Sequence, residues 1–159
     1  MNSENLIRYS AGGIELLDRV EPLWVQLIRH DSESSPFFQE EIASRTFRNR
    51  RADLISKSRN GHIRVDLAEN VKTGELTGYC ISTIDDRHVG EIDSIFVMEK
   101  ERGAGIGDAL MNRALEWLDA KEATSKILVV ATGNERVHSF YAKYGFFPIA
   151  STLRQRTDK

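Results

Sequence analysis

The feature that most constrains the fold is a change of hydrophobic period across a glycine-rich loop. Residues 88–97 alternate as a strand does, and the loop at 103–107 carries three glycines. From there through residue 119, apolar side chains recur at helical spacing. The apolar run 127–131 then reads as a strand covered on both faces. Strand, helix and strand in this order predict a βαβ unit with parallel strands.

The rest of the chain predicts an antiparallel meander and further helices. The fold class is therefore mixed α+β, an antiparallel meander leading into a parallel βαβ crossover with helices on both faces, in one domain over residues 1–159. The expected elements are a strand at 6–9, a helix at 22–30, a loop at 31–35, a helix from Pro36 to Ser58 capped by Ser35, strands at 62–68 and 76–84, a helix at 134–144 ended by Gly145, and a closing strand at 146–154.

Composition removes several classes of protein. The 22 basic and 24 acidic residues give a net charge of −2, so nothing draws the whole chain to nucleic acid or to a membrane. Cys80 is the only cysteine, which excludes an intrachain disulfide, and the scattered histidines show no metal-ligand spacing. No apolar run is long enough to span a bilayer, and the N-terminus does not read as a secretory signal. We expect a cytoplasmic protein without a metal.

The glycine loop predicts a site for a phosphate-like anion, because its backbone N–H groups are unshielded and lie at the positive end of a helix dipole. Two common templates fail. A dinucleotide fingerprint needs glycine or alanine where Asp108 or Leu110 stands, and a P-loop needs Gly-Lys followed by Ser or Thr where Gly107 precedes Asp108. A nucleotide-binding switch is therefore disfavoured.

The pattern that remains, Arg102-x-x-Gly105-x-Gly107, resembles the pyrophosphate-binding motif of the GNAT acetyltransferase superfamily. Downstream, Asn134 and the segment 140–146 resemble that family's second motif, with Val137 in place of its usual alanine. The resemblance implies acetyl-coenzyme A (acetyl-CoA) as acyl donor, an amine-bearing acceptor and, in some members, a homodimer. The cofactor-binding residues that it implies are Ile95, Phe96, Val97, Arg102, Gly103, Ala104, Gly105, Ile106, Gly107, Asn134 and Tyr141.

Acetyl transfer to an amine needs a base, because an ammonium with a pKa of about 10.4 leaves only about one molecule in two thousand nucleophilic near neutral pH. Glu91 and Asp93 point to the same face of their strand by period-two alternation. The resemblance implies Glu91 as the base, since it stands eleven residues before Arg102. The alternatives are salt-bridged strand carboxylates, or a pair that binds a cationic substrate without moving protons.

The resemblance also implies that Tyr141 is the general acid for the departing thiolate and that Asn134 contacts the pantetheine arm. The alternative for Tyr141 is a core tyrosine on an amphipathic helix. His138 shares that helical face at a variable family position. Cys80 reads as a buried structural thiol.

A second function remains open: a non-catalytic acyl-CoA sensor or interaction module that keeps the anion cradle. The basic residues between Arg45 and Arg59 read as a solvated helix face rather than a nucleic-acid site, with docking of the coenzyme A 3′-phosphate as a further use. Acceptor identity depends in this family on residues 24–58, where Asp31 and Glu33 favour a cationic acceptor.

Overall fold

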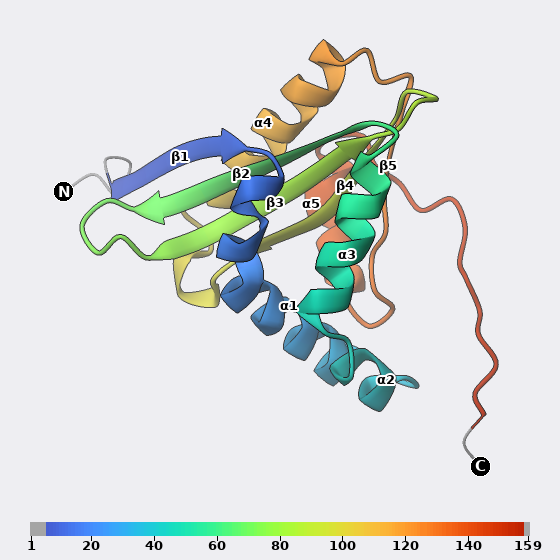
Figure 1. Cartoon of the computed structure of the whole chain (residues 1–159). Coiled ribbons are helices and arrows are strands. Elements are labelled where there is room, and N and C mark those ends of the chain that lie inside the picture. Colours follow the sequence, from blue (N-terminus) through green and yellow to red (C-terminus); the bar gives the residue numbers. More distant parts are fainter. Residues whose placement is uncertain (1–5, 158–159) are drawn as a thin grey trace.

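The computed structural model describes residues 6–157, which form a five-stranded mixed sheet with helices on both faces (Figure 1). The strands follow the order β1-β2-β3-β4-β5 across the sheet, and every neighbouring pair is antiparallel except β4 and β5, which are parallel. The predicted fold class, with its meander and its parallel crossover, is confirmed. The strands are β1 Ile7–Gly12, β2 His62–Asn70, β3 Leu76–Ile84, β4 Val89–Val97 and β5 Ser125–Leu128.

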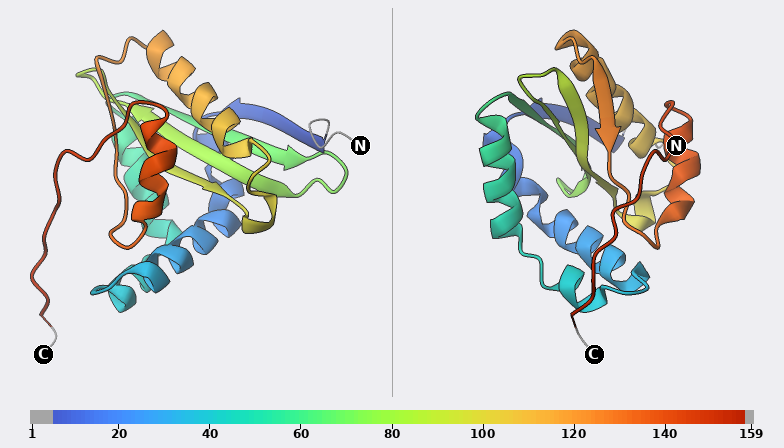
Figure 2. Two further views of the ribbon diagram at one scale, coloured as in Figure 1. Left: turned by 180° about the vertical axis from the view of Figure 1, so that it is seen from behind. Right: turned by 90° about the vertical axis from the view of Figure 1, so that its right-hand side faces the viewer.

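The helices divide between the two faces of the sheet (Figure 2). One face carries α1 and α3, and the other carries α4 and α5, so each face has its own apolar core. The α-helices are α1 Glu21–Ser34, α2 Gln39–Ala43, α3 Phe47–Ser58, α4 Ile106–Ala120 and α5 His138–Ala142. Three short 3-10 helices span Ile14–Val20, Glu99–Glu101 and Glu135–Val137. No helix among the described residues is both long and apolar enough to cross a membrane.

A β-bulge in β4 decides which side chains reach each core. Ile81 pairs with Ser94 and Ser82 pairs with Ile92, so Asp93 is the extra residue. Before the bulge, Ile92 packs on the α4 side; after it, Phe96 packs on the α1 and α3 side. The bulge therefore reverses the alternation of β4 at the middle of the strand.

The first half of the chain departs from prediction in two places. Helix α1 continues to Ser34, so the expected loop at 31–35 is mostly helical and Asp31 lies on a helix. The single helix expected from Pro36 to Ser58 is wrong, because it divides into α2 and α3. Thr46 causes the break: its hydroxyl accepts a hydrogen bond from the Asn49 backbone N–H (3.2 Å) and caps α3.

The C-terminal part differs more. The strand expected at 127–131 is Ser125–Leu128, and Val129 beyond it is 83% exposed, so the apolar run is not covered on both faces. The closing strand expected at 146–154 is absent from the described residues. That tail leaves the sheet in an extended path (Figure 1), with Ile149 98% exposed and Arg154 paired with Glu41 on α2. The short edge strand β5 offers a four-residue register only, and the tail does not pair with it.

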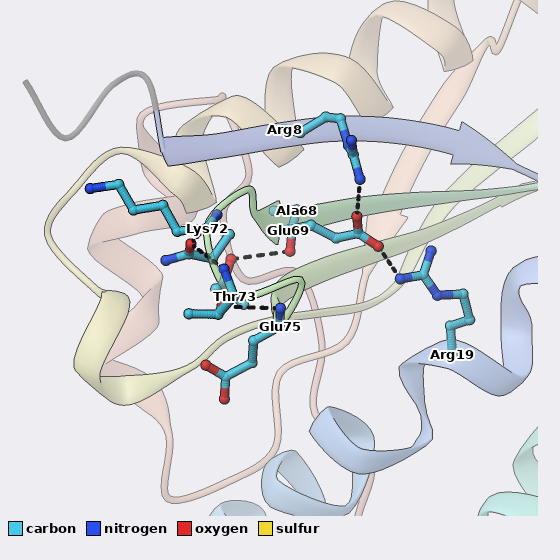
Figure 3. Close-up of polar contacts among 9 residues, drawn as sticks. Arg8, Arg19, Ala68, Glu69, Lys72, Thr73 and Glu75 are labelled. Atoms are coloured by element: carbon cyan, nitrogen blue, oxygen red, sulfur yellow. Dashed lines mark hydrogen bonds and ion pairs between the residues drawn. The ribbon is translucent and has the colours of Figure 1, made fainter.

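A buried carboxylate joins the start of the chain to the sheet. Glu69 on β2 is 7% exposed and accepts hydrogen bonds from Arg8 on β1 (2.8 Å) and from Arg19 on the first 3-10 helix (Figure 3). Both guanidinium groups hold the pKa of Glu69 below its ordinary value. The contacts fix the N-terminal strand and the 3-10 helix, which leads into α1.

Candidate active site

A cavity of about 540 Å³ opens where β4 and β5 separate. The two strands pair only from Val89 opposite Ser125 to Ile92 opposite Leu128, so the edge of β4 beyond Ile92 has no strand beside it. The cavity is lined by that part of β4, the glycine loop, residues 128–131, α1 and the α5 region. A free strand edge at the wall of a cavity presents backbone N–H and C=O groups to an extended ligand.

The glycine loop forms one end of the cavity. Gly103 and Gly105 have φ values of 87° and 84°, a conformation that L side chains rarely adopt, and a Cβ added at either would meet no protein atom within 4 Å. Gly105 is the N-cap of α4 and offers no side-chain cap, so the first N–H groups of that helix face the loop. Arg102 braces the turn by donating from Nε to the Val97 carbonyl (3.0 Å), with its guanidinium 5.3 Å from the centre of the Phe96 ring. These features fit an anionic ligand.

The structure brings most of the predicted cofactor-binding residues to this cavity. Ala104, which is exposed, does not line it. The predicted residues that line the cavity are Ile95, Phe96, Val97, Arg102, Gly103, Gly105, Ile106, Gly107, Asn134 and Tyr141.

Tyr141 on α5 lines the cavity, and its hydroxyl makes no hydrogen bond to any residue in 6–157. The pKa of Tyr141 is raised to about 12, first by burial and then by the charges of Cys80 and Asp31. The phenol is therefore protonated throughout the neutral range. Its ring stacks edge-to-face on Phe140, with the ring centres 5.3 Å apart, which fixes its direction.

Glu91 and Asp93 lie together, as the alternation predicted, and Lys57 of α3 donates to both: to Asp93 Oδ1 at 2.6 Å and to Glu91 Oε2. Asp93 also accepts from the Thr83 hydroxyl (2.7 Å), and its side chain is 2% exposed. Burial raises the pKa of Asp93, while Lys57 and Thr83 oppose that rise. Asp93 lines the cavity, whereas Glu91 does not. The geometry is that of an ion-paired cluster with one carboxylate at the cavity wall.

Sequence reasoning missed the contribution of His30, which lies on α1. His30 lines the cavity and its Nε2 lies 3.4 Å from Asn134 Oδ1, while the Arg136 guanidinium approaches the same nitrogen (3.3 Å). Gly133 makes this approach feasible, because a Cβ there would lie 2.0 Å from the Ser34 carbonyl oxygen at the end of α1. Gly133 beside Asn134 was the only local signal of this close approach, and the sequence could not show that its partner is Ser34 on α1.

The remaining candidates lie outside this cavity. Cys80 is fully buried, as predicted, and burial raises the pKa of its thiol to about 12. His138 does not line the cavity. Among the basic residues of α3, Arg51 pairs with Asp18 (2.8 Å) and Lys57 with the β4 carboxylates, so part of this face serves internal ion pairs rather than solvent. Within residues 6–157, no three His, Cys, Asp or Glu side chains group as a metal site.

The fold and the site together define a class: a mixed α+β protein with an anion cradle at a helix N-terminus, opening onto a cleft between separating parallel strands. The sequence pattern described as the acetyltransferase (GNAT) family matches residues 24–146. The chain belongs to that family.

Two curated relatives agree with this assignment. An uncharacterized N-acetyltransferase of Methanocaldococcus jannaschii is 41% identical over 66 residues, which are 42% of this chain and 29% of the relative. An uncharacterized N-acetyltransferase of Archaeoglobus fulgidus is 32% identical over 95 residues, 56% of this chain and 61% of the relative. The matches thus span less than two thirds of these relatives' length.

Solved structures share the fold. An acetyltransferase of Trypanosoma brucei matches with a TM-score of 0.62 and 25% identity, over 94% of this chain and 99% of that one. A ribosomal-protein-alanine N-acetyltransferase of Brucella melitensis has a TM-score of 0.62 at 16% identity, over 94% and 99% of the two chains. The enzyme AAC(6′)-Iy, in complex with the bisubstrate analogue CoA-S-monomethyl-acetylneamine, has a TM-score of 0.66 at 16% identity, over 96% and 99%.

Proposed function

We propose that the chain is a single-domain, acetyl-CoA-dependent N-acetyltransferase that transfers an acetyl group to a primary amine by direct attack in a ternary complex. The observation that carries the proposal is one continuous cavity. It joins the glycine cradle, the unpaired edge of β4 and the free hydroxyl of Tyr141.

Separate regions of the cavity fit the diphosphate, the pantetheine arm and the thioester of acetyl-CoA. The turn at Gly103 and Gly105 has open space where side chains would stand, so a diphosphate can approach the backbone N–H groups at the head of α4. The pantetheine amides can pair with the free edge of β4 as a short extra strand would. A backbone amide near Val97 then polarises the thioester carbonyl. The solved complex of AAC(6′)-Iy with a coenzyme A bisubstrate analogue supports this reading.

Proton movements follow from the groups at the wall. The acceptor ammonium loses one proton to a base before attack. The first candidate for this base is Asp93, at the cavity wall, and the second is Glu91, which accepts a hydrogen bond from the same Lys57. The amine nitrogen forms the C–N bond as the C–S bond breaks. Tyr141 donates its proton to the leaving sulfur, and the second proton lost by the nitrogen restores the phenol. One proton is released per turnover.

The non-catalytic alternative keeps the cradle but needs no proton donor. Tyr141 lines the cavity and its hydroxyl makes no hydrogen bond to residues 6–157, so the phenol is available to a bound substrate, which favours the catalytic reading.

The direct test follows thiol release from acetyl-CoA with purified protein and a panel of primary amines. We expect acceptor-dependent release. Tyr141→Phe should lower kcat by about 100-fold or more while the Kd for acetyl-CoA changes less than about twofold, because the substitution removes the proton and keeps the ring. Tight binding of acetyl-CoA without release by any amine would support the sensor alternative.

A further inference from the structure

The carboxylates at the cavity wall differ in how they are satisfied. Asp93 is held by Lys57 and Thr83, as described above. Asp108, in the first turn of α4, accepts hydrogen bonds from Lys143 (2.8 Å) and from the Tyr144 hydroxyl. These two carboxylates are occupied by the protein itself.

Asp31 on α1 is different. It lines the same cavity, and its Oδ1 is the one buried side-chain N or O atom in residues 6–157 without a hydrogen-bond partner. A buried carboxylate oxygen left unpaired opposes folding, and because Asp31 as a residue lines the cavity, its carboxylate marks a group that a ligand can complete. The sequence pointed to Asp31 and Glu33 together as favouring a cationic acceptor, but it placed them in a loop and could not show which carboxylate is left unpaired.

The surroundings of Asp31 define what can complete it. The side chains that act on it electrostatically are His30, on its own helix, and Arg45, between α2 and α3. Burial outweighs both, and the pKa of Asp31 lies above its ordinary value. The charge of Asp31 also raises the pKa of Tyr79 and of Tyr141, but the Tyr79 hydroxyl is already hydrogen-bonded to the Ser94 hydroxyl (2.7 Å). None of the described residues donates a hydrogen bond to Asp31 Oδ1, and a cationic ligand would supply that donor.

We propose that Asp31 binds the ammonium group of the acceptor, so that the acceptor class is aliphatic primary amines, which are protonated at neutral pH, and not arylamines. The inference rests on the proposed acetyltransferase function and adds its acceptor subsite. Asp31 and Tyr141 line one cavity and interact electrostatically, so an amine held at Asp31 lies in the same cavity as the proposed proton donor. Asp31 holds the amine, and the base removes its proton.

The test compares Asp31→Asn with Glu33→Gln, an exposed carboxylate two residues along α1 that does not line this cavity. The acceptors are a matched pair, benzylamine, which is charged at pH 7.5, and aniline, which is not, together with butylamine and a lysine-containing tripeptide. The wild-type protein should use the charged amines. Asp31→Asn should raise their KM by about 10- to 100-fold, the scale of one hydrogen bond to a charged group, while the KM for acetyl-CoA stays unchanged.

Thermal unfolding of the ligand-free protein separates a binding role from a structural one. Asp31→Asn removes an unpaired buried charge and keeps the shape, so the Tm at pH 7 should rise by about 2–4 °C, whereas Glu33→Gln should leave it unchanged. A fall in Tm, an unchanged KM for charged amines, or a wild-type preference for aniline would overturn the inference. Failure of the wild-type protein to use any amine would instead count against the proposed function, and the Tm comparison would still decide whether Asp31 is unpaired.

Discussion

Gly105→Ala should weaken acetyl-CoA binding far more than it weakens the fold. Gly105 stands at φ 84° with nothing near its would-be Cβ, so the substitution costs backbone strain of about 1 kcal/mol and no collision within the protein. For a chain of 159 residues that strain lowers Tm by about 3 °C. The methyl group, however, projects from the N-cap of α4 into the space where the diphosphate must approach the backbone. Calorimetry should show the Kd for acetyl-CoA raised by about 10-fold or more.

Gly74→Ala is the matched control for this experiment. Gly74 has φ 71° and also no atom within 4 Å of an added Cβ, but it lies in the turn between β2 and β3, away from the cavity. Its Tm should fall by a similar amount while acetyl-CoA binding stays as in the wild type. Equal affinity in Gly105→Ala and wild type, or equal losses in both variants, would refute the assignment of the cradle.

Two further predictions concern protonation. Lys57→Met leaves the 2%-exposed Asp93 with Thr83 and with Arg50 at 4.0 Å, so urea unfolding at pH 7 should show a free energy of unfolding lower by about 2 kcal/mol. Because the pKa of Asp93 is raised in the folded state, protonation removes the uncompensated charge, and this loss of stability should shrink as the pH falls toward 5. A loss of stability that does not depend on pH would contradict this prediction. With the pKa of Tyr141 near 12, the phenol keeps its proton at lower pH, so kcat should show no basic decline below about pH 10; a decline centred near pH 8 that disappears in Tyr141→Phe would show that the phenol titrates much lower.

The parts of the molecule that sequence could predict are those set by local chemistry. The strand before the loop, the glycines at positive φ and the helical spacing of α4 all depend on residues within a few positions of one another. The cap at Gly145, whose φ is 84°, is of the same kind. These features place the cradle and Tyr141, and they carried the family resemblance.

The parts that could not be predicted depend on distant partners. Lys57 reaches Glu91 and Asp93 across more than thirty residues, and nothing near the strand signals that a helix lysine occupies both carboxylates. His30 meets Asn134 across 104 positions. The bulge at Asp93 likewise arises from the pairing with β3 and redirects the second half of β4.

The C-terminal tail shows the opposite error, in which a local pattern predicted too much. A closing strand was expected at 146–154, yet its apolar residues Phe147, Ile149 and Leu153 are 72%, 98% and 92% exposed. A strand forms only where an edge of matching length is available, and β5 ends at Leu128.

The central claim is that the backbone at the head of α4 holds the diphosphate of coenzyme A. Calorimetric titration of the intact protein with acetyl-CoA and with S-acetylpantetheine, which carries the same thioester arm but no diphosphate, tests it most directly. The account predicts measurable binding of acetyl-CoA and an affinity for S-acetylpantetheine lower by about 100-fold or more. Equal affinities, or no binding of acetyl-CoA at millimolar concentration by folded protein, would contradict it.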